Sequence, residues 1–142
     1  MTARALLVAT AFLLVGAASA HAQDVEFQRV LESASQSWAR GDAEAIAALA
    51  TRGGLFINVA GRSFGPLGSR HAAALLRDLF ESIGIARLER RSIQFIGGPQ
   101  PRGYGEFIWR TEGGQPTTVF LGLVQEKDGW RLTEIRVSIP GW

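Results

Sequence analysis

Residues 114–140 read GQPTTVFLGLVQEKDGWRLTEIRVSIP, and the arrangement of the rest of the chain depends on them. They contain two segments rich in Val, Ile, Leu and Thr, residues 117–126 and 130–139, on either side of Asp128-Gly129. Asp-Gly between such segments predicts a hairpin, because Gly tolerates the positive φ that a tight turn requires. We therefore expect central strands of a strongly curved antiparallel sheet, which the preceding residues must cover.

Three helices are expected before this hairpin, at residues 25–40, 43–50 and 71–83. The first has apolar side chains at the three- to four-residue spacing that gives a helix one apolar stripe. Asp42 and Ser69 are the predicted N-caps of the second and third helices. The predicted buried stripe of the third helix consists of Ala74, Leu75, Leu79, Phe80 and Ile83.

Four further strands are expected at residues 55–60, 62–64, 86–96 and 104–112. They are separated by segments rich in Gly and Pro, which are typical of turns. The predicted order of elements is therefore α-α-β-β-α-β-β-β-β, and the predicted fold class is α+β.

Residues 1–22 have the pattern of a signal peptide. Arg4 supplies a positive charge, residues 5–18 carry no charge, and both Ala20 and Ala22 end a small-x-small sequence that fits a cleavage site. The uncharged segment spans about 21 Å as a helix, which is shorter than the ~30 Å hydrocarbon core of a membrane. We therefore predict cleavage after Ala22 rather than a permanent anchor.

The remaining residues, 23–142, are predicted to form one domain that is secreted or periplasmic. The chain has no cysteine, so neither a lipid-attachment cysteine nor a thiolate metal site is expected. Of 15 basic residues, removal of Arg4 leaves 14, against 13 acidic residues. This near-neutral balance favours neither a nucleic acid nor a membrane surface as a partner after cleavage.

Four local features occur along the chain in a telling order: the corner at residues 39–42, the strand that begins at residue 55 after two glycines, the helix after Ser69, and the hairpin at residues 128–132. This order resembles the nuclear transport factor 2-like, cystatin-like superfamily. The chain looks most like its short secreted bacterial domains of unassigned function. The resemblance implies a cone: a curved sheet wrapped around a long N-terminal helix, with a pocket at the open end. It also implies a homodimer that pairs through the outer face of the sheet.

Ketosteroid isomerase chemistry, one activity of this superfamily, needs a carboxylate base together with a Tyr and a protonated acid. The resemblance places Asn58 at the position of the base, Ala34 at that of the Tyr, and Leu121 at or next to that of the acid. None of these side chains has the required group, and Asn58 is expected to point into the cone. We therefore expect this activity to be absent.

Both faces of the final hairpin are predicted to be largely apolar. Alternation along the strands assigns Thr133, Ile135, Val137 and Ile139 to one face, with Val119, Leu121 and Leu123. It assigns Trp130, Leu132, Glu134, Arg136 and Ser138 to the other face, with Phe120, Gly122 and Val124. The helices cover one face, and a homodimer partner or a ligand is expected to cover the other.

Glu134 and Arg136 lie two residues apart on a central strand, where they form either a polar ligand site or a structural ion pair. Glu106 and Arg110 are further members of either network, whereas His71 is expected to be exposed to solvent. The candidate ligand-binding residues are Trp38, Asn58, Tyr104, Trp109, Glu134 and Arg136. No catalytic residue, metal or cofactor is assigned.

Two functions remain open. The preferred one is an exported, non-catalytic domain that binds a small ligand or a protein. The alternative is a small-molecule isomerase or lyase with an atypical site, in which Glu134 acts as acid or base and Arg136 or Asn58 holds an anion.

Overall fold

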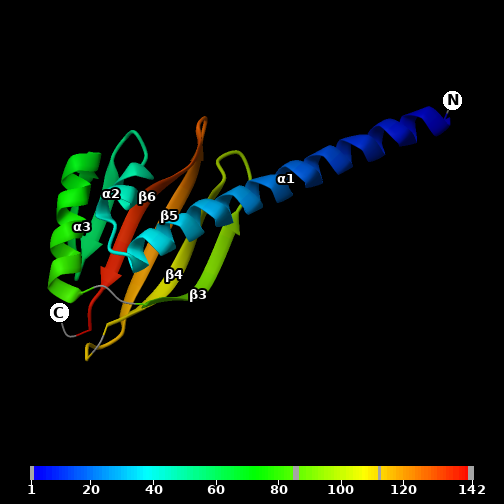
Figure 1. Ribbon diagram of the computed structural model, residues 1–142. Coiled ribbons are helices and arrows are strands. Elements are labelled where there is room, and N and C mark those ends of the chain that lie inside the picture. Colours follow the sequence, from blue (N-terminus) through cyan, green and yellow to red (C-terminus); the bar gives the residue numbers. More distant parts are fainter. Residues whose placement is uncertain (1, 85–86, 112, 141–142) are drawn as a thin grey trace.

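The computed structural model describes residues 2–84, 87–111 and 113–140, and the side chains among them from residue 21 onward. Its elements are α1 (Thr2–Ala39), α2 (Ala43–Ala48), β1 (Leu55–Val59), β2 (Arg62–Leu67), α3 (Ser69–Ile83), β3 (Arg87–Ile96), β4 (Arg102–Arg110), β5 (Thr117–Glu126) and β6 (Gly129–Ser138) (Figure 1). This order confirms the α+β prediction. The predicted strand ends at Ala86 and Glu112 lie outside the described residues.

The six strands form one open sheet in the order β2-β1-β6-β5-β4-β3 (Figure 1). The predicted hairpin is confirmed, since β5 and β6 pair antiparallel from Thr118 opposite Ser138 to Glu126 opposite Gly129. The sheet is mixed rather than wholly antiparallel, because β1 runs parallel to β6. The helix α3 and the four strands β2, β3, β4 and β5 separate β1 from β6 in the chain, which leaves β1 free to enter the sheet in that direction.

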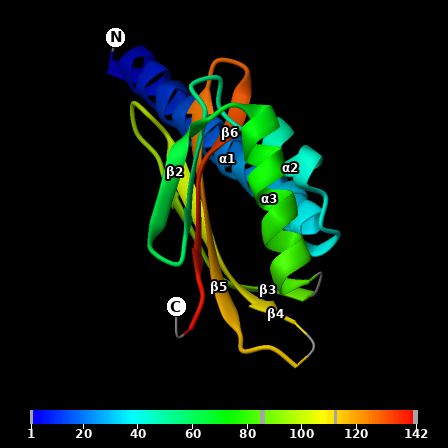
Figure 2. The same cartoon turned by 90° about the vertical axis from the view of Figure 1, so that its left-hand side faces the viewer.

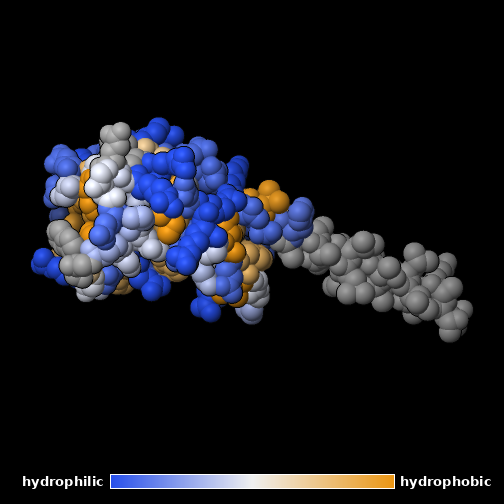
Figure 3. Space-filling view, turned by 90° about the horizontal axis from the view of Figure 1, so that it is seen from below, coloured by the Kyte–Doolittle hydropathy of each residue, from blue (hydrophilic) through white to orange (hydrophobic). Residues whose placement is uncertain are grey.

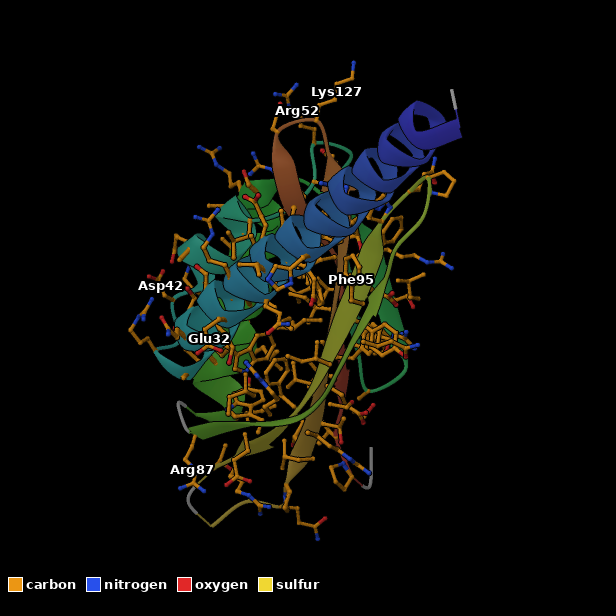
Figure 4. The ribbon with its side chains drawn as sticks, turned by 90° about the vertical axis from the view of Figure 1, so that its right-hand side faces the viewer. Glu32, Asp42, Arg52, Arg87, Phe95 and Lys127 are labelled. Carbon is orange, nitrogen blue, oxygen red and sulfur yellow. The ribbon has the colours of Figure 1, made fainter. Side chains whose placement is uncertain are left out.

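The helix α1 crosses one face of the sheet, and α2 and α3 lie together beside the C-terminal end of α1 (Figures 1 and 2). The predicted stripe of α1 is confirmed at its centre, since Phe27, Leu31, Ala34 and Trp38 are buried. Phe27 also packs against Phe95, with ring centroids 5.9 Å apart. Phe95 lies on β3 beside α1 (Figure 4). These contacts join the first helix to the last strands of the chain.

Two glycines of β4 let α1 approach the sheet closely. A Cβ atom at Gly103 would lie 2.6 Å from the ring of Phe27, and one at Gly105 would lie 2.9 Å from Leu31. Both distances are shorter than any ordinary carbon–carbon contact. The absence of a side chain at these two positions therefore determines how deeply α1 is seated.

The helix α3 differs from the prediction at its start and in its buried face. Its N-cap is Gly68 rather than Ser69, and no side chain caps it. The buried residues are Ala72, Ala73, Leu76, Leu79 and Phe80. Ala74 is exposed instead, and Leu75 and Ile83 are only partly buried. The helix α3 packs against α2 as well as against β1 and β2 of the sheet.

The cap of α2 is confirmed, since the Asp42 carboxylate accepts a hydrogen bond from the backbone N–H of Ala45 at 3.1 Å. Residues 2–22 of the predicted signal peptide, which spans residues 1–22, fall within the span of α1. The side chains of residues 1–20 lie outside the described part, so cleavage and the domain limits 23–142 stay predictions. No helix among the described residues is long and apolar enough to cross a membrane.

Candidate functional site

Three of the predicted ligand-binding residues meet on the outer face of the sheet, the face opposite α1. Tyr104 of β4 lies beside Phe120 of β5, with ring centroids 5.0 Å apart and planes tilted by 31°. The guanidinium of Arg136 lies over the Phe120 ring, 4.2 Å from its centroid, and its Nε is 2.8 Å from the Glu134 carboxylate. Both charged side chains are about half exposed, so their ion pair is worth little by itself.

The outer face is hollowed next to this cluster. The hollow has a volume of about 860 Å³. Its lining includes Tyr104, Phe120 and Glu134, together with Pro99 and Gln100 of the β3–β4 connection. The hydroxyl of Tyr104 also donates a hydrogen bond to Gln94. The cluster is therefore an aromatic surface bordered by polar and charged groups.

Asn58 does not point into the cone. It follows the inward-facing Ile57 and lies opposite Arg136 in the parallel ladder, on the outer face. Its amide donates to the Ser63 hydroxyl at 2.8 Å and accepts from the backbone N–H of Gly61 at 3.2 Å. Asn58 thus stabilises the β1–β2 turn, a common role for this residue type. The prediction for this side chain was wrong, and Asn58 gives no argument about a base inside the cone.

The two predicted tryptophans are core residues rather than lining residues of a pocket. Trp38 and Trp109 are completely buried. Their rings meet edge to face with centroids 5.3 Å apart, and each also meets Phe80 edge to face. Such packing is the preferred arrangement of aromatic rings in protein cores. The predicted site therefore divides into two buried residues and four on the outer face.

A β-bulge in β6 explains a further error in the predicted faces. Gly122 lies opposite Glu134, whereas its neighbour Leu123 lies opposite Leu132, so Thr133 is an extra residue in the strand. The extra residue reverses the alternation. Leu132 is therefore buried on the same face as Ile135, and so is Trp130, although the prediction grouped both with Glu134 and Arg136.

Glu106 and Arg110 belong to ion pairs along β3 rather than to the Glu134–Arg136 pair. Arg91 lies 3.7 Å from Glu106, and Arg110 lies 2.8 Å from Glu89. Hydrogen bonds from Arg87 and then from Arg110 lower the pKa of Glu89 to about 2. Because Arg87, Glu89 and Arg91 lie on the edge strand β3, they form a charged sheet edge, which resists pairing with another strand.

His71 is exposed in the first turn of α3, as predicted. Within residues 2–84, 87–111 and 113–140, no group of three or more His, Asp or Glu side chains is arranged to hold a metal ion.

A second hollow, which we call the mouth cavity, lies at the end of the sheet near the C-terminus of α3. Its volume is about 490 Å³. The lining residues are Val59, Leu79, Ser82, Ile83, Thr111, Gly114, Gln115, Thr117, Ile139 and Pro140. Figure 3 views this end of the molecule and shows apolar side chains between hydrophilic ones. None of the described lining residues is ionisable.

The mouth cavity is hard to predict from the sequence, because its described lining comes from four separate segments. They are the end of β1, the last turn of α3, the β4–β5 connection with the start of β5, and the residues after β6. None of these segments has a binding motif. Only the resemblance, which implies a pocket at the open end of the cone, indicated this region.

No family model matches the chain, and no curated protein matches it. Several solved structures have a similar fold. A protein of unknown function with a cystatin-like fold from Nostoc punctiforme has a TM-score of 0.65 at 10% identity, over 83% of this chain and 91% of that chain. A nuclear transport factor 2-like protein with a cystatin-like fold from Novosphingobium aromaticivorans has a TM-score of 0.62 at 15% identity, over 90% and 88%.

A DUF4783 family protein from Bacteroides ovatus has a TM-score of 0.63 at 13% identity, over 78% of this chain and 94% of that chain. Identities this low establish the fold and leave the function open. The chain has the nuclear transport factor 2-like, cystatin-like fold.

Proposed function

We propose that this protein is an exported, non-catalytic binding domain that holds a small molecule in the mouth cavity. The observation that carries the proposal is the lining of that cavity, whose described residues are apolar or neutral. Its volume of about 490 Å³ falls within the range of known small-molecule sites. Export, to the periplasm or the medium, follows from the predicted signal peptide at residues 1–22.

The placement of acidic groups supports binding over catalysis. Acid–base catalysis needs a titratable side chain next to the reacting group. The buried polar side chains among the described residues are Ser37 and Thr117, neither of which titrates near neutral pH. Glu106 and Glu134 lie on the outer face in ion pairs with arginines.

The alternative, an isomerase or lyase, would use the hollow on the outer face. Glu134 lines that hollow beside Tyr104, which gives this alternative its one supporting observation. The reaction would then depend on the Glu134 carboxylate, whereas the binding of a ligand in the mouth cavity would not. Glu134→Gln is therefore expected to leave ligand binding unchanged, and a loss of turnover on any substrate in this variant would favour the enzyme.

We also propose that the outer face is the interface of a homodimer. Phe56 of β1 is 52% exposed on this face, close to the cluster of Tyr104, Phe120 and Arg136. Aromatic residues and Arg are enriched in the centres of protein interfaces. The adjacent opposite charges of Glu134 and Arg136 suit a two-fold interface, in which each charge can meet its opposite on the partner.

A neutral fluorescent probe tests the binding proposal. N-phenylnaphthylamine is expected to become brighter on binding to the mature protein, because its emission rises in apolar surroundings. Ile83→Trp, which fills the mouth cavity, should remove most of this signal. Ala74→Trp is the matched control, because it adds the same side chain to the exposed side of the same helix. Equal binding by wild type and Ile83→Trp would contradict the proposal.

A further inference from the structure

Among the described lining residues of the mouth cavity, Thr117 is the one buried polar residue. It is the first residue of β5, lies opposite Trp109 and is only 3% exposed. Its Oγ1 donates to the backbone carbonyl of Gln115 at 3.5 Å, which is much longer than the usual 2.7–2.8 Å of a hydroxyl hydrogen bond. The hydroxyl is therefore shielded from bulk water and weakly bonded inside the protein.

The hydroxyl of Ser82, also in the lining, is better satisfied. Ser82 donates to the backbone carbonyl of Asp78 at 2.8 Å and is exposed to solvent. A buried polar group without a good partner costs free energy, and a ligand that supplies the partner recovers it. Thr111 is only half-buried, so Thr117 is the most buried hydroxyl of the described lining and the position where a hydrogen bond donated to a ligand acceptor adds most.

Charge in a ligand would be unfavourable at this site. An ionised group that leaves water needs an opposite charge or several hydrogen bonds to offset its desolvation. The described lining offers neither, since Val59, Leu79, Ile83, Ile139 and Pro140 make up its apolar part.

We infer that the ligand of the mouth cavity is a neutral, mainly apolar molecule with a hydrogen-bond acceptor that Thr117 holds. This inference rests on the proposed binding function and adds the chemical class of the ligand. Three matched naphthalene compounds separate the contributions: the methyl ketone, which has a neutral acceptor; ethylnaphthalene, which has the same shape without one; and naphthoate, which carries a negative charge.

The dissociation constants of these compounds, measured by isothermal titration calorimetry on the mature protein, test the inference. The ketone is expected to bind roughly two- to tenfold more tightly than ethylnaphthalene, the contribution of one net hydrogen bond. Naphthoate is expected to bind more weakly than either.

Substitutions at Thr117 assign the preference to its hydroxyl. Thr117→Val keeps the side-chain shape, so the ketone and ethylnaphthalene should bind it equally. Thr117→Ser keeps the hydroxyl and should retain the preference, which separates loss of the hydrogen bond from damage to the fold. Thr118→Val is the matched control, because Thr118 is next in the strand and points to the opposite face of the sheet.

The possible failures are distinguishable. Naphthoate binding as tightly as the ketone, or a ketone preference that survives Thr117→Val, would overturn the inferred ligand class and leave the binding function intact. Absence of binding by all three compounds would overturn the proposed function and this inference with it.

Discussion

Replacement of Gly103 by Ala is expected to destabilise the protein by about 1–3 kcal/mol, the usual cost of inserting an atom into a packed core. The added Cβ would lie 2.6 Å from two ring atoms of Phe27 and 2.9 Å from the backbone oxygen of Gln94. The backbone oxygen cannot rotate away as a side chain can, and Phe27 is completely buried. The substitution must therefore shift α1 relative to β4.

Gly122→Ala is the matched control on the neighbouring strand. A Cβ there would lie 3.4–3.7 Å from its nearest neighbours, which is ordinary contact. Removing a glycine from a strand stabilises it by roughly 0.5–1 kcal/mol when the new side chain fits. Urea denaturation at one protein concentration measures both variants. Equal midpoints for Gly103→Ala and Gly122→Ala would refute the packing of α1 on β4.

Three further predictions concern the dimer, the charged edge and export. Phe120→Glu is expected to give monomer or aggregate in light scattering, and a monomeric wild type would contradict the proposed interface. The pKa of Glu89 is lowered to about 2. Its carboxylate therefore stabilises the folded protein at pH values above the ordinary pKa of a glutamate, and this contribution is lost as the pH falls toward 2. The difference in melting temperature between wild type and Glu89→Gln should therefore shrink over that interval, whereas a constant difference would argue against the Arg87–Glu89–Arg110 cluster. Mass spectrometry of the exported protein should show Gln23 or His21 at the N-terminus, and an intact Met1 would disprove cleavage.

The order of the elements was predictable because local signals mark most of their ends. Asp128-Gly129 identifies the last hairpin, Asp42 caps α2, and the spacing from Phe27 to Trp38 identifies the buried face of α1. Each of these signals depends only on residues that are close together in the sequence. The same kind of local reasoning also placed His71 correctly at the exposed start of α3.

The faces of the strands were harder to predict, because they depend on pairing between distant segments. The bulge at Thr133 exists only in the register between β5 and β6, and alternation alone therefore put Leu132 on the wrong face. Asn58 was misplaced because a strand position inferred by counting does not show which way its side chain points. The described lining of the mouth cavity combines four segments, so only the folded chain brings Val59 close to Thr117.

Amide chemical shifts in the mature protein, recorded with and without ethylnaphthalene, test the central claim most directly. We predict that the largest changes occur around the mouth cavity, at residues such as Leu79, Ile83 and Thr117. Changes centred instead on Tyr104 and Phe120 would place the ligand on the outer face and contradict the proposed function.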